Sequence, residues 1–229
     1  MKLTFLFCAL VLAMVAPSSS WAWDHVYDGS VLPNDASLAN RWAVGGTGGG
    51  IAMCSTDGDV LCINDTRTDT CVFFSKGAQP GPITMESGVR VATVSGQCVS
   101  MAVGTASFST AVNLYPGYLQ VFFDYGNPPV TYSADLTAFH ALRVAINAQG
   151  QSYVWLDQTL IAQGATHVGG QGGIYFGGTS VGGLGQSYWD YVAYSASFDP
   201  VPEPSSLASL CVGLLPLPFA MKRPRRNKT

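Results

Sequence analysis

Apolar and polar residues alternate in short runs through the middle of the chain, and turn-forming residues separate these runs. A period of two is typical of β-strands that bury one face. The runs are rich in β-branched and aromatic residues, which favour strands, and no convincing amphipathic helix pattern interrupts them. The clearest predicted strands lie within 83–95, 97–104, 118–126, 139–150, 151–164, 172–178 and 187–198.

The links between these runs are short and rich in glycine. Residues 147–150 (NAQG) predict a hairpin, and Asp157 with Gln158 predicts a tight turn. Links of this length cannot hold the helical crossover that parallel neighbours need, so we expect antiparallel strands. The pattern predicts an all-β protein, an antiparallel β-sandwich that forms one domain over residues 23–200.

The first 22 residues have the layout of a secretory signal peptide. Lys2 precedes an apolar run from Leu3 to Ala16, and the small residues around Ala22 suit cleavage after that position. The alternative is a transmembrane anchor, but the run is shorter than the ~20 residues that a spanning helix needs. We therefore expect the rest of the chain to be exported.

Residues 201–229 combine three features in a fixed order. The triplet Pro202, Glu203, Pro204 comes first, an apolar run (207–221) follows, and a cluster of lysines and arginines ends the segment. Taken alone, these features predict a weak single-pass transmembrane anchor whose basic end stays in the cytoplasm. Two prolines within the apolar run would kink a helix there.

This order of features resembles the PEP-CTERM sorting tail of bacterial exopolysaccharide producers. In that family an exosortase recognises the tail at the inner membrane and removes it near the Pro-Glu-Pro motif. The resemblance implies exosortase-type sorting machinery as a partner and transient association with the inner membrane. It also implies a final place at the cell surface or in the extracellular matrix. The sequence leaves open whether the tail is cleaved or remains as an anchor.

Charge distinguishes the predicted domain from the two ends. Residues 23–200 carry five basic and 13 acidic residues, a formal net charge of −8, whereas the whole chain has −3. A negative domain disfavours nucleic acid and anionic membranes as partners.

The last third of the domain resembles the end of a concanavalin A-like (laminin-G-like) jelly roll. The matching segments are FHALRVAINAQGQSYVWLDQTLIAQG, GGIYFGG and GQSYWDYVAYS, and MESGVRVATV resembles the family's central strand. The resemblance implies that the segment WDHVYDG (23–29) pairs with the final strand. The positions that match the family's pattern are His140, Arg143, Asp157, Gly177 and Asp190.

Four cysteines lie within the domain, and export would place them in an oxidising compartment. Their even number predicts two disulfide bonds, and three pairings stay open. A zinc site is the alternative, but the spacing offers no close pair and no nearby histidine. The expected disulfide cysteines are Cys54, Cys62, Cys71 and Cys98.

The segment between the first three cysteines is acidic. Carboxylate oxygens are the ligands that Ca²⁺ prefers, so this segment is a candidate Ca²⁺ site, although no glutamate completes a known calcium loop. The alternative is a solvated loop, and no other cofactor is implied. The candidate ligands are Asp57, Asp59, Asp65 and Asp69.

Candidate catalytic residues are scarce. Glucanases with a jelly-roll fold use two glutamates on one strand, whereas this domain has only Glu86. We predict that Glu86 forms an ion pair with Arg90, four residues further along the same strand face. No serine lies in a Gly-x-Ser-x-Gly motif. We therefore predict no catalytic residue and no enzyme activity; a polysaccharide hydrolase with an unrecognised aspartate site is the less favoured alternative.

Aromatic residues supply the candidate ligand site. Tyr153 and Trp155 share one strand face, Tyr188 lies on the final predicted strand, and His167 lies in a glycine-rich loop. These four are the predicted ligand-binding residues. We expect a non-catalytic binding or extracellular-matrix protein that recognises extracellular polysaccharide. The alternative is a structural cell-surface or biofilm protein without a small ligand.

Overall fold

The computed structural model describes residues 23–47, 49–96, 99–124, 126–168, 172–178 and 182–200. The predicted signal peptide and sorting tail lie outside these ranges, so both stay predictions. Within the described part of the chain, no helix is long and apolar enough to cross a membrane.

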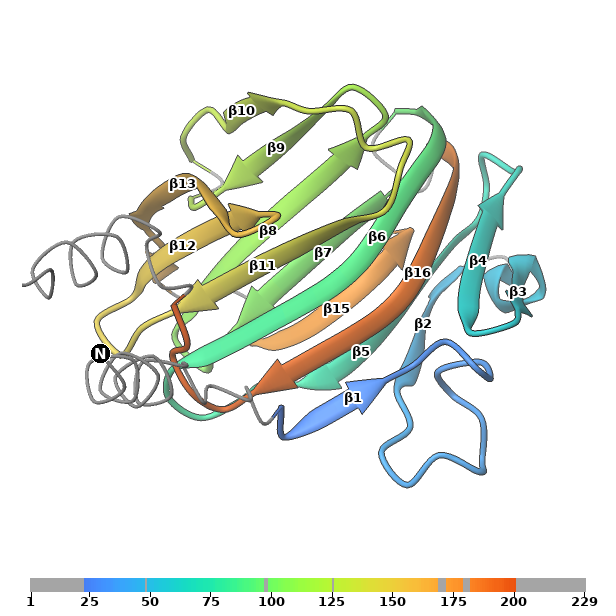
Figure 1. The fold of residues 1–229 in the computed structure, drawn as a ribbon, viewed down its shortest axis with the longest axis horizontal. Coiled ribbons are helices and arrows are strands. Elements are labelled where there is room, and N and C mark those ends of the chain that lie inside the picture. Colours follow the sequence, from blue (N-terminus) through green and yellow to red (C-terminus); the bar gives the residue numbers. More distant parts are fainter. Residues whose placement is uncertain are drawn as a thin grey trace, which may run out of the picture.

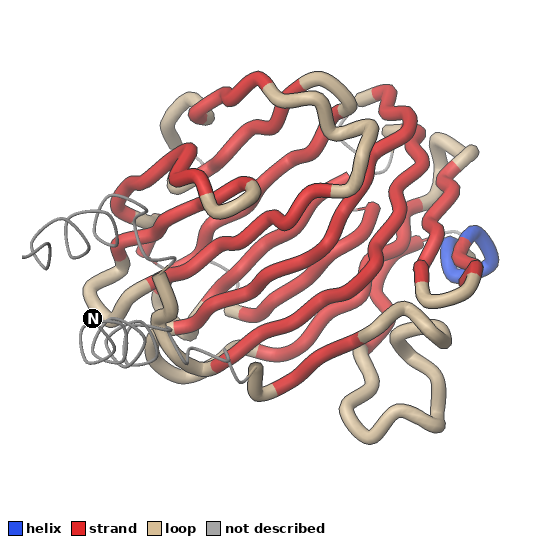
Figure 2. Tube along the Cα trace, in the orientation of Figure 1, coloured by secondary structure: helices blue, strands red, loops and turns tan. Residues whose placement is uncertain are grey.

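Two antiparallel sheets form a β-sandwich, as the sequence predicts (Figures 1 and 2). Sheet A has the order β13-β12-β11-β6-β16-β4-β3. Strand β1 also pairs with β16, along a different stretch of that strand from β4. Its strands are β1 (His25–Tyr27), β3 (Cys54–Asp57), β4 (Val60–Asp65), β6 (Ile83–Ser95), β11 (His140–Ile146), β12 (Gln151–Leu156), β13 (Thr159–Ala165) and β16 (Leu184–Ser195).

Sheet B lies on the other side of the core and has the order β10-β9-β8-β7-β15-β5-β2, with β14 paired to β8. A single turn of 3₁₀ helix, η1 (Gly50–Met53), leads from sheet B into sheet A. The strands of sheet B are β2 (Ala43–Thr47), β5 (Cys71–Gly77), β7 (Val99–Gly104), β8 (Phe108–Tyr115), β9 (Tyr118–Phe122), β10 (Val130–Ser133), β14 (His167–Val168) and β15 (Gly173–Gly178).

Several local predictions are confirmed. The run 83–95 is strand β6, and β1 pairs with the final strand β16 in the register that places Val26 opposite Ala193. Asp157 and Gln158 form the turn between β12 and β13, and both have positive φ (48° and 69°). Two successive positive φ angles give the type of turn whose twist matches a hairpin. The Asp157 carboxylate holds this turn, because it contacts His140 Nδ1 at 2.5 Å and accepts from Ala141 N at 3.0 Å.

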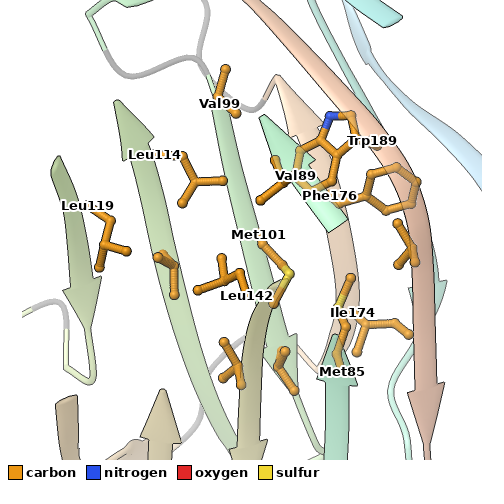
Figure 3. Packing of buried hydrophobic residues seen from close by; sticks show 14 of the residues in the cluster. Met85, Val89, Val99, Met101, Leu114, Leu119, Leu142, Ile174, Phe176 and Trp189 are labelled. Atoms are coloured by element: carbon orange, nitrogen blue, oxygen red, sulfur yellow. The ribbon is translucent and has the colours of Figure 1, made fainter. Parts of the chain in front are cut away.

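The core consists of the inward side chains of both sheets (Figure 3). Alternation along β6 directs Met85, Val89 and every second residue around them inward. The Trp189 ring of β16 is fully buried, lies 5.0 Å from the Phe176 ring of sheet B, and donates its Nε1–H to Ser187 Oγ at 3.0 Å. This aromatic contact joins the two sheets across the core.

Candidate functional site

Each sheet has an outer face that points away from the core, and the two outer faces differ in composition. Alternation places Glu86, Arg143 and Trp155 on the outer face of sheet A, because their strand neighbours are core residues. On sheet B, alternation directs Ser100 and Ala102 outward between the core residues of β7.

A largely buried ionic network occupies the outer face of sheet A. Arg143 lies directly opposite Glu86 in the register of β11 and β6, and its Nε donates to Glu86 Oε2 at 2.7 Å. The Tyr191 hydroxyl donates to the other oxygen of Glu86 at 2.8 Å. Burial and this ionised acceptor raise the pKa of Tyr191 well above its usual value. Both oxygens of Glu86 are therefore engaged in structural hydrogen bonds.

The predicted pair of Glu86 with Arg90 is wrong. Four residues along a strand span ~13 Å, whereas residues directly opposite on neighbouring strands have Cβ atoms ~5 Å apart. Arg143 is that opposite residue and takes the carboxylate.

The two ends of the described domain meet on the same face of sheet A. After β16 the chain turns back, and Thr84 Oγ1 donates to Ser197 O at 2.8 Å and accepts from Asp199 N at 2.9 Å. Arg143 Nη1 donates to Asp199 O at 3.3 Å. Ala196 N donates to Asp24 Oδ2 at 2.9 Å, which joins the first and last segments. The chain's own ends thus cover part of the outer face of sheet A.

The returning C-terminal segment packs beside Tyr153 and Trp155, two of the predicted ligand residues. Tyr153 and Trp155 stack with ring centroids 5.8 Å apart, as their shared strand face predicts. The Trp155 side chain is only 3% exposed, however, and the Phe198 ring lies 5.4 Å from Tyr153. Trp155 is thus a packing residue in this structure, and very little of its side chain is accessible to a ligand.

The remaining predicted ligand residues lie apart from this pair. Tyr188 is on the outer face of sheet A, opposite Arg90 on one side and Cys62 on the other. His167 is in β14 of sheet B, opposite Ser109 of β8. The four residues predicted to bind a ligand therefore do not form one site.

The outer face of sheet B carries a different set of side chains, which we call the sheet-B platform. Its centre consists of small residues that are 2–5% exposed, and half-buried aromatic and amide side chains surround them. The platform consists of Phe73, Ser100, Ala102, Ala111, Asn113, Tyr115, Tyr118, Gln120, Phe122 and Tyr175.

Aromatic pairs lie on both sides of the small residues. The rings of Tyr115 and Tyr118, on β8 and β9, are stacked with centroids 4.3 Å apart. The rings of Phe73 and Tyr175, on β5 and β15, lie 5.9 Å apart. Phe73 can lie flat because it covers Gly45, where a Cβ would come within 2.3 Å of the ring.

A polar row crosses the sheet-B platform between these aromatic pairs. Ser100, Asn113 and Gln120 are directly opposite one another on β7, β8 and β9. Gln120 Oε1 accepts a long hydrogen bond from the Tyr115 hydroxyl at 3.5 Å. The Asn113 amide makes no side-chain hydrogen bond within the described residues. None of the ten residues of the sheet-B platform carries a charge.

Sequence reasoning missed this site. The alternation of FSTAVNLY and YLQVF already places Asn113, Tyr115, Tyr118 and Gln120 on one face of their strands. It does not reveal that Phe73 and Tyr175, which are remote in sequence, lie on the same face, because that depends on the order of strands in the sheet.

The predicted Ca²⁺ site is not formed. Asp57 and Asp59 lie at the tip of the β3–β4 hairpin, whereas Asp65 is at the opposite end of β4. Asp69 instead pairs with Arg67 at 2.6 Å, and Asp65 is buried and accepts from Thr70 Oγ1 at 2.9 Å. No group of three or more acidic, histidine or cysteine side chains in the described ranges is arranged to hold a metal ion.

The prediction of two disulfide bonds is also wrong for this structure. Cys54, Cys62 and Cys71 are free thiols, and two bonds among four cysteines would require at least one within these three. Cys98 lies outside the described residues. The register pairs Cys54 with Ile63 and Cys62 with Ser55, so these two cysteines point to opposite faces of their hairpin. Burial raises the pKa of Cys54 to about 12 and keeps it a thiol.

The chain has a jelly-roll β-sandwich fold of the concanavalin A-like type. No family model and no curated protein matches the sequence. Among solved structures, it is similar to a prokaryotic β-1,3-1,4-glucanase (lichenase) derived from a mouse hindgut metagenome. That match has a TM-score of 0.55 and 14% identity, and covers 76% of this chain and 99% of the glucanase.

Two further solved structures share the fold at a TM-score of 0.50. One is the cellulose-induced protein Cip1, at 13% identity over 68% of this chain and 91% of Cip1. The other comes from work on botulinum neurotoxin type C, whose cell entry depends on interaction with two ganglioside molecules. This match has 9% identity and covers 81% of this chain and half of the toxin chain. At these identities the similarity shows the fold alone.

Proposed function

We propose that the chain is a non-catalytic glycan-binding protein and that the sheet-B platform is its binding surface. The observation that carries this proposal is the juxtaposition of two aromatic pairs with a row of hydroxyl and amide side chains. Sugar rings present an apolar face and a rim of hydroxyl groups. Aromatic rings complement that face, and amides of asparagine and glutamine both donate to and accept from hydroxyl groups.

The absence of charge on the sheet-B platform favours a neutral glycan. A charged ligand group that lost its water there would find no opposite charge among the platform residues, and this is costly. A neutral chain of hexoses pays no such penalty. The names of two structurally similar proteins, a β-1,3-1,4-glucanase and a cellulose-induced protein, refer to neutral polysaccharides and are consistent with this ligand class.

The lack of enzyme activity is part of the proposal. Hydrolysis of a glycosidic bond by the common mechanism needs two carboxyl groups on either side of the bond. None of the sheet-B platform residues is acidic, and Glu86 is bonded to Arg143 and Tyr191 on the other sheet. The surface therefore suits binding without cleavage.

Export and surface sorting are proposed from the sequence at the two ends. Residues 1–22 supply a signal peptide, and the order of Pro202, Glu203, Pro204, the apolar run and the basic cluster supplies a sorting tail. In this proposal, exosortase-type machinery acts at the inner membrane and delivers the domain to the cell surface or matrix. Replacement of the Pro-Glu-Pro triplet by alanines, followed by fractionation, tests it; unchanged size and location would contradict sorting.

A binding assay on the purified full chain tests the glycan proposal. A glycan array that includes neutral β-glucans should give a specific signal, and isothermal titration should show binding that weakens by about tenfold in Tyr118→Ala. Tyr132→Ala is the matched control, because Tyr132 is an exposed tyrosine of β10 that faces the other side of sheet B. Binding to no glycan, or an equal loss in both variants, would overturn the proposal. Release of reducing sugar would overturn its non-catalytic part.

A structural matrix role is the second candidate, and the exposed edges of the sheets favour it. Edge strands are usually protected by charged side chains. Among the described residues, four of the five exposed large hydrophobic side chains lie on the edge strands β1, β2 and β10: Val26, Val44, Val130 and Tyr132. Sedimentation of the wild type and a Val130→Lys variant distinguishes the candidates: self-association that the lysine abolishes would support the structural role.

A further inference from the structure

A cation on the outer face of sheet A lies between two aromatic rings, and we call this group the Arg90 clamp. Tyr188 of β16 is directly opposite Arg90 of β6. On the other side of β6, Phe139 comes just before His140, the residue of β11 that pairs with Val89. The Arg90 guanidinium carbon is 3.9 Å from the centroid of the Tyr188 ring and 5.4 Å from that of Phe139. The clamp consists of Phe139, Arg90 and Tyr188.

Arg90 differs from the arginines that have acidic partners. Arg67 pairs with Asp69 at 2.6 Å and Arg143 pairs with Glu86 at 2.7 Å. Within the described ranges, Arg90 forms no ion pair and no hydrogen bond. Its Nε is buried and has no hydrogen-bond partner, while the residue as a whole is half-buried.

The aromatic contacts fix the orientation of this side chain. A guanidinium group stacks on aromatic rings through its flat face and keeps its N–H groups free at its edge. Those N–H groups form a planar fork that matches the two oxygens of a carboxylate. Because stacking already restricts the side chain, a ligand would find the fork ready for binding.

We propose that the Arg90 clamp binds the carboxylate of an acidic sugar, such as a uronate residue within a glycan. The Phe139 ring is 44% exposed beside the guanidinium and offers an apolar surface to the same sugar. The net charge of −8 over residues 23–200 repels a dense polyanion, and exposed Asp190 of β16 lies close by on sheet A. One stacked cation therefore suits an isolated carboxylate on an otherwise neutral chain.

This site is separate from the sheet-B platform, since it lies on the opposite outer face of the sandwich. The proposal goes beyond the proposed function: it adds a second site with a different ligand chemistry. Loss of either site leaves the other intact, so the two proposals fail independently.

A pair of matched ligands tests the Arg90 clamp. One is a glucuronate-containing oligosaccharide, and the other is the same oligosaccharide with its carboxyl group reduced to the alcohol. Titration calorimetry on the full chain should show at least about tenfold tighter binding of the carboxylate form. Equal affinity for the two ligands, or tighter binding of an acidic peptide than of the uronate, would overturn the proposal.

Variants assign the effect to the fork. Arg90→Gln should remove the preference for the carboxylate, and Arg90→Lys should retain only part of it, because a lysine keeps the charge but not the planar fork. Arg41→Gln is the matched control, because Arg41 is exposed and this substitution removes the same charge at a different place on the surface. A preference that survives Arg90→Gln would overturn the proposal.

Phe139→Ala provides a test that does not depend on the fold tolerating a change at Arg90. Phe139 is exposed, so its removal should leave the unfolding temperature nearly unchanged while binding of the uronate ligand weakens severalfold. Unchanged uronate binding in Phe139→Ala would contradict the role of the ring. Tyr118→Ala should bind the uronate ligand as the wild type does, which separates this site from the sheet-B platform.

Discussion

The outer faces of the two sheets follow the same alternation of residues but differ in chemistry and accessibility. Sheet A directs Glu86, Arg143 and Tyr191 outward, and these side chains bond to one another and to the ends of the domain. Sheet B directs small, aromatic and amide side chains outward, and none of the platform residues is charged. The outward charges of Glu86 and Arg143 thus serve the fold, while the neutral face of sheet B is the surface that we propose binds a neutral glycan.

The largest expected effect is on stability and comes from sheet A. Glu86→Gln removes the charge that compensates Arg143, whose side chain is only 9% exposed. Breaking such a largely buried pair leaves one charge uncompensated, so the free energy of unfolding should fall by about 3 kcal/mol. Urea denaturation measures the change. Neutral-glycan binding of the folded variant should equal that of the wild type; a loss of binding would contradict the separation of the two faces.

The next largest effect is on binding and comes from sheet B. Asn113→Ala removes an amide from the middle of the polar row, and glycan affinity should fall by about tenfold. Because the amide is half-buried and makes no side-chain hydrogen bond within the described residues, the unfolding free energy should change by at most about 0.5 kcal/mol. Titration calorimetry and urea denaturation on the same preparation measure both. A stability loss comparable to that of Glu86→Gln would show that Asn113 is structural.

A smaller effect concerns the pH dependence of binding. The sheet-B platform contains no aspartate, glutamate or histidine, so affinity for a neutral glycan should stay constant between about pH 5 and pH 8. Titrations across this range provide the measurement. A step in affinity near pH 6.5 would contradict the expectation.

The smallest expected effect is acid sensitivity that arises outside the sheet-B platform. Hydrogen bonds from Ser30 lower the pKa of Asp28, and those from Thr137 lower the pKa of Asp135. A carboxyl group whose pKa is lower in the folded than in the unfolded state stabilises the fold at pH values above its unfolded pKa. This stabilisation is lost as the pH falls through the folded-state pKa. Asp135→Asn should therefore slightly reduce the difference in melting temperature between pH 7 and pH 3. Melting curves by circular dichroism test this, and an enlarged difference would contradict it.

The sequence predicts local structure well where a short segment determines it. The bounds of β6, the turn at Asp157 and Gln158, and the pairing of β1 with β16 all follow from alternation, turn residues or resemblance. The contacts across strands do not follow in the same way. Arg143 lies opposite Glu86 only because β11 and β6 are neighbours, and no pattern within either strand specifies that.

The candidate sites show the same limit. Alternation correctly places Tyr153 and Trp155 on one face, but it cannot show that Phe198 returns to pack against Tyr153. Counting cysteines predicts disulfides, whereas the register directs Cys54 and Cys62 to opposite faces of a hairpin. In each case the missing information is the three-dimensional neighbour, which depends on the whole topology.

The hydrogen bond between Ala196 N and Asp24 Oδ2 has a geometric consequence for display of the domain. The described domain starts and finishes at one spot, on the side of the sandwich away from sheet B. A support attached at the C-terminal end would therefore leave sheet B facing outward. For the same reason a short peptide would bridge the two ends of the described domain, so the domain is a natural candidate for circular permutation or for insertion into a loop of another protein.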